Sequence, residues 1–460
     1  MNDSSQTGVL QALDETGLQK FHWRTVITAG MGFFTDAYDL FIIGTVTAIL
    51  TPLWHLSTGQ LAILNSTSLA AAAFGALVFG RLMDRLGRKA MYGIEVMMLA
   101  GGALLSALAP SFGWLVVFRI LVGLGVGGDY PTSSVIMSEY ANRTHRGFLV
   151  TLVFSMQGLG LLAGPAVAAI LLASGMSHDL AWRLMLGLGA IPAASVIYLR
   201  RRMAETPRYL VTVQGKTDEA AEVVKSLTGK AVVAEANAPT KVQGGLWTRK
   251  NLIRLLGTAG SWFLVDVAFY GNGVSSQLIL KALLPQAHLI EKVLVSALIF
   301  LVAAVPGYYV AAYFMDKIGR KWIQSVGFLV MAITYGLIFG VPRIIQMPVL
   351  FLIVYAVSYF FIEFGPNTTT FLVPSEVFPT HLRGTAHGIS AAAGKIGAFL
   401  GAFVLPFVLK SAGLGSTMGL LAAVALLGAA LTLATLPEMK QKSLEEVQTD
   451  PLPVAERRLS

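Results

Sequence analysis

Eight ionisable residues lie inside long apolar stretches of the sequence, where a membrane helix would bury them. They are Asp36, Asp39, Glu95, Arg119, Asp129, Asp266, Glu363 and Lys395. A charged side chain in lipid is unfavourable, so such residues usually mark the pathway of an ion or a substrate. Lys395 has no carboxylate one turn away on its own segment. Because a buried ammonium needs an anion, we expect its partner to be an aspartate on another helix or a bound substrate.

Asp36 and Asp39 form the closest pair of acids within one apolar stretch. Their i, i+3 spacing places both on one face of a helix. Two close carboxylates do not both ionise readily at low dielectric, so one of them is expected to keep a proton. The pair could therefore carry protons. The alternative is that it only makes hydrogen bonds between helices.

Polar side chains that could hold a ligand occur in three further apolar stretches. Trp262, Asp266 and Tyr270 follow each other at i, i+4 and i+8, and all three can donate hydrogen bonds if Asp266 is protonated. An aromatic stripe can also serve packing alone. Gln157 and Asn367 are amides near glycines, and each could bind a ligand or join two helices.

The elements that position these residues are predicted to be membrane helices. Of the 460 residues, 55% are hydrophobic, which is typical of a polytopic membrane protein. The length leaves room for about a dozen spans of roughly 20 residues. We predict an all-α protein with twelve transmembrane helices, at 24–50, 58–82, 89–110, 112–139, 147–173, 182–200, 254–280, 289–313, 322–341, 346–375, 384–409 and 415–437. A polar stretch then divides the chain into two six-helix halves, 1–200 and 254–437, with a central loop at 201–253 and a tail at 438–460.

The net charge of +9 arises from Lys and Arg in alternate loops. This asymmetry places both termini in the cytoplasm of a plasma (inner) membrane protein and argues against nucleic-acid binding. The chain has no cysteine, which excludes disulfides, thiolate catalysis and Cys-zinc sites. It also lacks the motifs of hydrolases, zinc proteases and P-loop enzymes. We therefore expect no enzyme, no cofactor and no metal, and a protein that works as a monomer in the bilayer.

Two sequence motifs occur once in each half. Gly80–Lys89 recurs as Ala312–Lys321, and Ser138–Gly147 recurs as Ser375–Gly384, at shifts of 232 and 237 residues. Duplicated six-helix halves are typical of secondary transporters, which bind substrate near the midplane between the halves. The charged residues of these motifs are predicted to lock or release neighbouring helices, with Glu139–Arg146 and Glu376–Arg383 as clasps. This gating set comprises Asp84, Arg85, Glu139, Arg146, Asp316, Arg320, Glu376 and Arg383.

The motif "GRLMDRLGRK" resembles the loop signature of the major facilitator superfamily. The stretches "AETPRYL" and "LPEMKQKSLEE" are similar to motifs that follow the sixth and twelfth helices in its sugar-porter and phosphate-porter branches. The resemblance extends over the whole chain. It implies the major facilitator fold and transport by alternating access.

A closer resemblance is to the phosphate:proton symporter family. It rests on "GGDYPTSSVIMSEYANRTHRG", "GFFTDAYDLFIIG" and "FGPNTTTFLVPSEVFP", which are similar to that family's fourth, first and tenth helices. The resemblance implies proton-coupled import of inorganic phosphate. The implied phosphate ligands are Tyr130, Gln157, Trp262, Asp266, Tyr270 and Asn367. The implied proton-linked residues are Asp36, Glu95, Asp129 and Lys395, with Asp129 paired to Lys395 when the site is empty.

The chain departs from that family at Glu363, which stands where "NFGPN" would place an asparagine. A carboxylate this close to Asn367 would repel phosphate unless it is protonated or turned away. The identity of the anion therefore stays open, and a proton symporter for another small anion, such as an organic carboxylate, is an alternative. Two further alternatives are a sugar:proton symporter, suggested by "AETPRYL", and a nutrient sensor with little flux.

Overall fold

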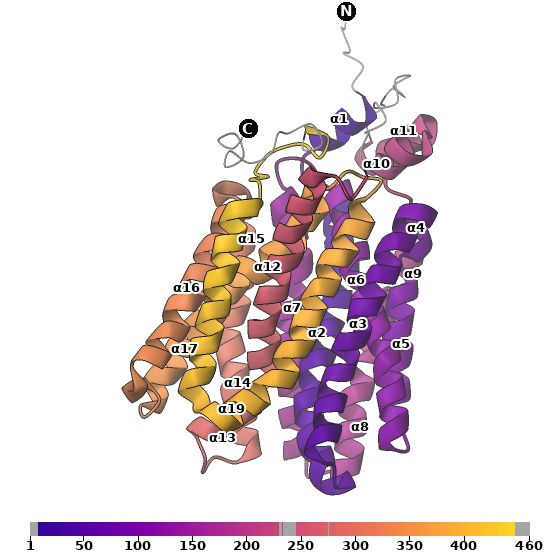
Figure 1. Cartoon of the computed structure of the whole chain (residues 1–460). Coiled ribbons are helices and arrows are strands. Elements are labelled where there is room, and N and C mark those ends of the chain that lie inside the picture. Colours follow the sequence, from indigo (N-terminus) through magenta and orange to yellow (C-terminus); the bar gives the residue numbers. More distant parts are fainter. Residues whose placement is uncertain (1–7, 230–231, 233–244, 275, 447–460) are drawn as a thin grey trace, which may run out of the picture.

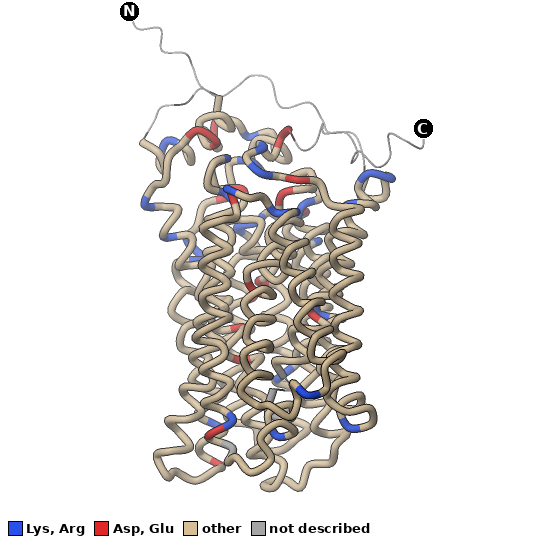
Figure 2. The backbone as a smooth tube through the Cα atoms, turned by 90° about the vertical axis from the view of Figure 1, so that its left-hand side faces the viewer, with Lys and Arg blue, Asp and Glu red and all other residues tan. Residues whose placement is uncertain are grey.

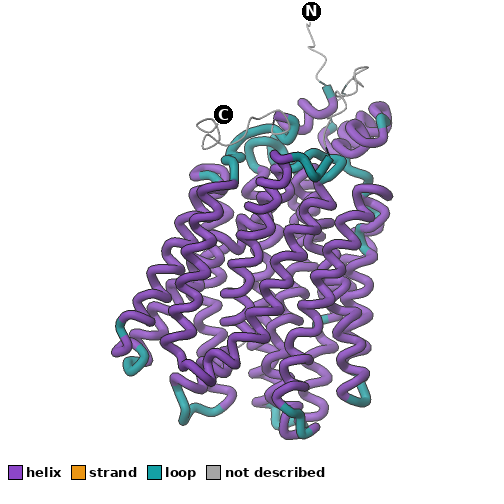
Figure 3. Tube along the Cα trace, in the orientation of Figure 1, coloured by secondary structure: helices purple, strands orange, loops and turns teal. Residues whose placement is uncertain are grey.

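The computed structural model describes residues 8–229, 232, 245–274 and 276–446. Long helices run side by side through the molecule, and short loops join them at both ends (Figures 1 and 3). The short helix α1 (Val9–Asp14) and the last described residues lie at the same end of the bundle, which we call the termini end (Figure 1). Lys and Arg gather at this end and are sparse along the middle of the bundle (Figure 2).

The first half of the chain supplies the helices drawn from indigo to magenta in Figure 1. They begin where local sequence allows: Ser57 and Gln60, for example, each accept a hydrogen bond from the other's backbone N–H and so cap the start of α3. The elements are α2 (Lys20–Trp54), α3 (Thr58–Leu86), α4 (Arg88–Met91), α5 (Ile94–Ala107), α6 (Phe112–Tyr140), α7 (Arg146–Ala173), α8 (His178–Leu188) and α9 (Ala190–Arg201). Three shorter elements follow at the termini end, α10 (Pro207–Tyr209), η1 (Leu210–Gln214) and α11 (Thr217–Thr228).

The second half supplies the helices drawn from rose-red through orange to yellow (Figure 1). They are α12 (Arg249–Val274), α13 (Ser276–Leu283), α14 (Leu289–Ile299), η2 (Phe300–Ala304), α15 (Val305–Ile318), α16 (Arg320–Gly340), η3 (Pro342–Ile344), α17 (Pro348–Ile362), η4 (Glu363–Asn367), α18 (Thr368–Val377) and α19 (Arg383–Thr435). Several follow one another without a loop: α14, η2 and α15 are continuous, and α17, η4 and α18 are joined across a kink at Gly365.

Eleven helical segments within the described residues are long and apolar enough to cross a membrane. The last of them, α19, has 53 residues and would be about 80 Å long if straight, far more than a bilayer core of about 30 Å. Gly413 interrupts it with a φ of 79°, and the chain turns back there (Figure 1). The predicted spans 384–409 and 415–437 therefore lie on either side of one break.

Equivalent positions of the two halves touch where α6 meets α18. The Ser134 hydroxyl on α6 donates to the carbonyl of Phe371 on α18, 3.2 Å away, and Ser138 donates to Ser375, 3.1 Å away. Each pair is separated by the 237 residues of the sequence repeat. Residues related by a pseudo-twofold axis can meet only near that axis, so it passes between α6 and α18.

Close approach at the termini end depends on glycine. A Cβ atom on Gly80 of α3 would lie 2.5 Å from the carbonyl oxygen of Gly384 on α19. No side chain fits at that distance without moving one of the two helices. This crossing joins the first half of the molecule to the second.

Candidate functional site

Four of the predicted ligands meet where the two halves face each other. Tyr130 on α6 and Gln157 on α7 come from the first half, and Tyr270 on α12 comes from the second. The Tyr130 and Tyr270 hydroxyl oxygens are 3.3 Å apart, and the Gln157 amide donates to Tyr130 over 3.1 Å. Asn367 in η4 lies 3.5 Å from Gln157 Oε1. All four side chains are at most 2% exposed, so the cluster is closed off from both ends.

Tyr308 on α15 belongs to the same cluster, and the sequence analysis missed it. Its hydroxyl donates to Gln157 Oε1 over 2.8 Å and accepts from Asn367 Nδ2 over 2.8 Å. The neighbouring Tyr309 is 40% exposed, whereas Tyr308 is fully buried. Two adjacent tyrosines in an apolar run give no sign of which one faces inward, so this residue needed the structure.

Lys395 on α19 is the cation of the cluster. Its ammonium donates to the Tyr270 hydroxyl over 3.0 Å and to Asp266 Oδ2 over 3.4 Å. It also lies 4.1 Å from the centre of the Tyr130 ring, where a cation–π attraction adds to the ion pair. Asp266 is therefore the carboxylate that the Lys395 side chain reaches on another helix.

Trp262 forms a wall of the cluster. Its ring centre is 5.7 Å from that of Tyr130 and 5.5 Å from that of the buried His387 on α19. A Cβ atom on Gly394 would lie 2.4 Å from the indole ring. The stripe of Trp262, Asp266 and Tyr270 thus combines packing with polar contacts, because its first member packs and the other two meet Lys395.

Asp129 pairs with a cation that the sequence analysis did not single out. The Arg200 guanidinium, at the end of α9, donates to the two Asp129 carboxylate oxygens over 2.6 and 3.1 Å. It also donates to Glu95 over 2.9 Å. The expected Asp129–Lys395 pair is absent from the described structure, because Arg200 and Ser133 occupy the Asp129 oxygens while Lys395 is bound to Asp266 and Tyr270.

Asp36 and Asp39 share a helix but have different surroundings. Asp39 forms a buried ion pair with Arg119 on α6, with 2.6 Å between Oδ1 and Nη1. Both carboxyl oxygens of Asp36 are buried and have no hydrogen-bond partner among the described residues. An ionised carboxylate without partners is unfavourable in an apolar interior. Of the pair, Asp36 is therefore the one suited to hold a proton.

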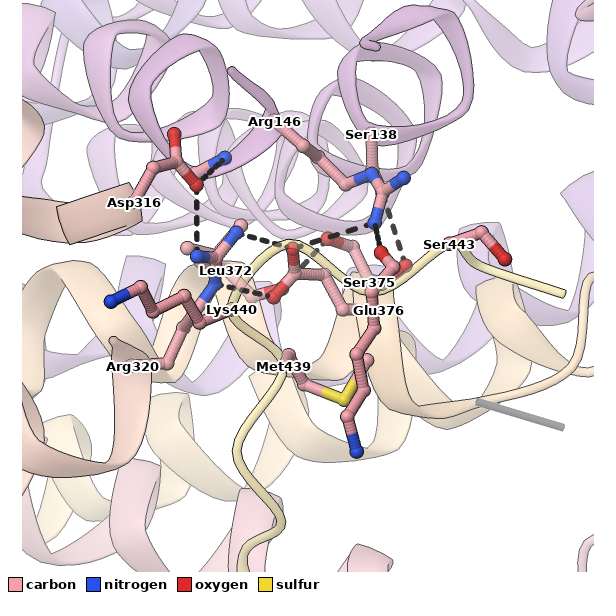
Figure 4. A network of polar contacts seen from close by, with 12 residues as sticks. Ser138, Arg146, Asp316, Arg320, Leu372, Ser375, Glu376, Met439, Lys440 and Ser443 are labelled. Atoms are coloured by element: carbon pink, nitrogen blue, oxygen red, sulfur yellow. Dashed lines mark hydrogen bonds and ion pairs between the residues drawn. The ribbon is translucent and has the colours of Figure 1, made fainter. Parts of the chain in front are cut away.

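The predicted clasps close between the halves and not within them. Arg383 on α19 binds Glu139 on α6 over 2.8 Å, and Arg146 on α7 approaches Glu376 on α18 to 3.9 Å. The expectation of Glu139–Arg146 and Glu376–Arg383 pairs was therefore wrong. The sequence repeat had identified the right residues, but each glutamate faces the arginine of the opposite half. Figure 4 shows Glu376 between Arg320 and Arg146.

Each glutamate has a second arginine from its own half. Arg320 on α16 binds Glu376 over 2.8 Å, and Arg88 on α4 binds Glu139 over 3.0 Å. Arg85, the predicted member of this set, is exposed and makes no ion pair within the described part of the chain. Gly87 is the reason: its φ of 98° ends α3 and turns Arg88 inward. The 232-residue repeat relates Arg320 to Arg88 and could have identified it.

Two aspartates complete this contact between the halves. The Asp84 carboxylate on α3 accepts hydrogen bonds from the backbone N–H groups of Gly384 and Thr385, at 3.0 and 2.6 Å. Asp316 on α15 accepts from Gly147 and Phe148, at 3.1 and 2.7 Å. These four donors lie at the first turn of α7 or α19, where backbone N–H groups lack helical partners. The termini end is thus closed by matching contacts on both sides of the pseudo-twofold axis.

The tail that follows α19 also joins the halves. Arg208 on α10 binds Glu445 and donates to Asp14 at the end of α1 over 2.6 Å. Burial opposes the charge of Glu445, but the guanidinium groups of Arg208, Arg146 and Arg383 outweigh it and hold the pKa of Glu445 below its usual range. The tail therefore adds a further ionic contact across the termini end.

Within the described residues, no three His, Cys, Asp or Glu side chains are grouped so that they could hold a metal ion. The site instead offers one ammonium, three tyrosine hydroxyls, two amides and several buried carboxyl groups. Such a set can bind a small anion and exchange protons.

Comparisons with known proteins agree over nearly the whole chain. Residues 24–450 match the family model of sugar (and other) transporters. The chain is 36% identical to probable inorganic phosphate transporter 1-6 of Arabidopsis thaliana, covering 99% of each protein. It is 38% identical to low affinity inorganic phosphate transporter 8 of Medicago truncatula, covering 96% of this chain and 92% of that one.

A solved structure of the proton:xylose symporter XylE, bound to 6-bromo-6-deoxy-D-glucose, matches with a TM-score of 0.80 and 21% identity, over 93% of this chain and 98% of that one. This likeness confirms the predicted all-α major facilitator fold. The similar proteins are transporters, which agrees with the expectation that the chain is not an enzyme. The chain belongs to the major facilitator superfamily and, within it, to the family of the inorganic phosphate transporters.

Proposed function

We propose that this protein imports inorganic phosphate together with protons by alternating access. The observation that carries the proposal is the unbroken polar chain from Lys395 through Tyr270, Tyr130 and Gln157 to Tyr308, which joins both halves at the buried centre. The names of the plant relatives support phosphate as the anion. An anion held by both halves would stabilise their closed arrangement, as alternating access requires.

Phosphate fits the donors of this cluster. It accepts hydrogen bonds on all its oxygens, and the cluster can donate from the Lys395 ammonium, the Tyr130 and Tyr270 hydroxyls and the Asn367 amide. Asp266 limits this arrangement, because an ionised Asp266 would repel the anion and compete for Lys395. A proton on Asp266 removes the repulsion and adds a donor. Anion binding and protonation therefore favour each other, which couples the two.

Asp36, Glu95 and Asp129 are proposed to relay the protons. Asp36 has no hydrogen-bond partner among the described residues for either carboxyl oxygen, and Glu95 and Asp129 share one guanidinium, that of Arg200. When Arg200 neutralises both acids only in part, one of them can take up a proton at little cost. Asp39 differs, because it forms a buried ion pair with Arg119, and its proposed share in coupling is to orient the first helix.

The contacts at the termini end are proposed to form the inner gate of a plasma-membrane protein with cytoplasmic termini. Opening this end requires the Glu139–Arg383 and Glu376–Arg146 contacts and those of Asp84 and Asp316 to separate. The two six-helix halves, 1–200 and 254–437, would then rock about the site as units within one monomer, with 201–253 and 438–460 on the cytoplasmic side. The membrane potential favours the inward movement of the protons, by about 2.3 kcal/mol for each positive charge per 100 mV.

The variant Asp129→Asn tests the relay. It should keep exchange of labelled phosphate between the two sides of proteoliposomes, because the binding cluster remains. It should lose accumulation driven by an inward proton gradient. Asp218→Asn, an exposed change on α11, is the matched control and should behave as the wild type. Full gradient-driven accumulation by Asp129→Asn would contradict the proposed role of Asp129.

A further inference from the structure

Glu363 lies inside the anion cluster and has no role in the function proposed above. It begins η4, a wider helical turn that runs from Glu363 to Asn367 and contains a non-helical Gly365. This local geometry points the carboxyl group at the cluster. Asn367 Nδ2 donates to Glu363 Oε2 over 2.5 Å, and the Glu363 side chain is fully buried. Glu363 is thus turned toward the site and not away from it.

Glu363 differs from most buried carboxylates of the molecule in having no cation. Asp39 pairs with Arg119, Asp266 with Lys395, and Glu95 and Asp129 with Arg200. No Lys, Arg or His within the described residues forms an ion pair with Glu363. The titratable groups that interact with it from the surrounding helices are Tyr308 on α15, Tyr335 on α16, Tyr359 on α17 and Asp266 on α12. Each of these is neutral or negative.

The hydrogen bonds around Glu363 also fail to support a negative charge. Its second oxygen, Oε1, is buried with no hydrogen-bond partner among the described residues. The nearby Tyr308 has one hydroxyl hydrogen, and Gln157 Oε1 and the Glu363 carboxyl group compete for it. A buried carboxylate with few donors and no cation is unfavourable, whereas the neutral acid needs fewer partners and gains a hydrogen to donate.

We propose that Glu363 is a proton-binding residue of the anion site. With its proton, Glu363 donates a hydrogen bond beside Asn367 and Tyr308 and leaves the site free of repulsion. Without the proton, its charge opposes the anion. Where the pH leaves Glu363 ionised in the empty protein, binding of the anion therefore takes up one more proton than the Asp36, Glu95 and Asp129 relay accounts for. Release follows when the proton leaves Glu363, so that proton and anion reach the same side together.

This inference rests on the proposed function, and it makes a distinct prediction about pH. At pH values where Glu363 is ionised in the empty protein, the protein must take up a proton when it binds the anion. For each proton taken up, the anion affinity then falls about tenfold for each unit by which the pH rises. Glu363→Gln keeps the size and a donor but cannot titrate. Its phosphate affinity should therefore fall less steeply as the pH rises, by up to about one factor of ten per unit.

The experiment is phosphate binding to the purified full-length protein in lipid nanodiscs, measured by calorimetry from mildly acidic to mildly alkaline pH. Glu363→Gln is compared with the wild type and with Glu222→Gln, an exposed change on α11. Glu363→Asn is the second neutral variant, in case Glu363→Gln does not fold. The expected result is a shallower pH dependence in the neutral variant, with wild-type behaviour for Glu222→Gln.

Two outcomes would overturn the inference. One is an unchanged pH dependence in a folded neutral variant, which would show that Glu363 does not titrate with binding. The other is complete loss of phosphate binding in a folded neutral variant, which would show that the charged form is needed. A folded wild type that binds no phosphate at any pH would instead contradict the proposed function, so the two failures are distinguishable.

Discussion

Arg200→Gln is the perturbation with the largest expected effect outside the anion cluster. Arg200 donates to Asp129 over 2.6 and 3.1 Å, to Glu95 over 2.9 Å, and to the Thr28 and Ala29 carbonyls over 3.1 and 3.0 Å. A neutral glutamine cannot balance the two carboxylates. Removing one partner of a buried ion pair costs about 3–5 kcal/mol. We expect a loss of unfolding free energy in this range at neutral pH.

The cause of this loss can be tested separately from its size. If unpaired charge is responsible, the deficit of Arg200→Gln should shrink as the pH falls, because protons then neutralise Glu95 and Asp129. Adding Asp129→Asn to Arg200→Gln should recover about 1–3 kcal/mol of the loss. Arg202→Gln is the control, since Arg202 is exposed and its guanidinium lies over the Tyr198 ring, and it should change stability by less than about 0.5 kcal/mol.

The assay is unfolding of the purified variants in detergent or nanodiscs, followed by tryptophan fluorescence. Denaturant midpoints at neutral and acidic pH give the differences between the variants. The reasoning is refuted if Arg200→Gln is as stable as the wild type at neutral pH. It is also refuted if Asp129→Asn deepens the loss, because the Asp129 charge would then not be what Arg200 neutralises.

Three further predictions concern the termini end. Glu139→Gln removes the carboxylate that Arg383 and Arg88 both bind, so hydrogen exchange of the backbone amides around residue 139 should become severalfold faster. An unchanged exchange rate would argue against a gate there. Gly80→Val should abolish gradient-driven phosphate uptake in proteoliposomes without unfolding the protein, because no side chain fits in that crossing; normal uptake would contradict this. Glu445→Gln should lose about 1.5 kcal/mol of stability at neutral pH. Because the folded-state pKa of Glu445 is lowered, this contribution exists above its unfolded pKa and disappears as the pH falls through the folded value. At low pH the variant and the wild type should therefore unfold alike.

The fold was predictable because its signals are local and repeated. The apolar segments show in composition, and the repeated motifs show the two halves. Gly413 was harder, because one glycine between predicted spans does not reveal that the helix resumes directly after it. Tyr308 could not be told from Tyr309, since both lie in an apolar run and only packing decides which of them is buried.

The pairing of charges was less predictable than their identity. Glu139 and Arg146 are seven residues apart in the sequence, which suggested a local clasp, yet Glu139 binds Arg383 because the two halves cross at the pseudo-twofold axis. Arg200 is the first of three consecutive arginines at the end of a predicted span, a pattern that marks the cytoplasmic side of a membrane helix. That pattern gave no indication that Arg200 pairs with carboxylates inside the bundle. Contacts between distant helices depend on tertiary packing, and the spacing of residues along one helix does not predict them.

Uptake of radiolabelled phosphate into proteoliposomes, with and without an inward proton gradient, tests the central claim most directly. Unlabelled arsenate, carboxylates and sugars are added as competitors. The account predicts accumulation that needs the gradient, that falls when Lys395 is replaced by glutamine, and that carboxylates and sugars do not inhibit. Uptake that is the same with and without the proton gradient would contradict it. So would uptake that a carboxylate or a sugar inhibits and unlabelled phosphate does not.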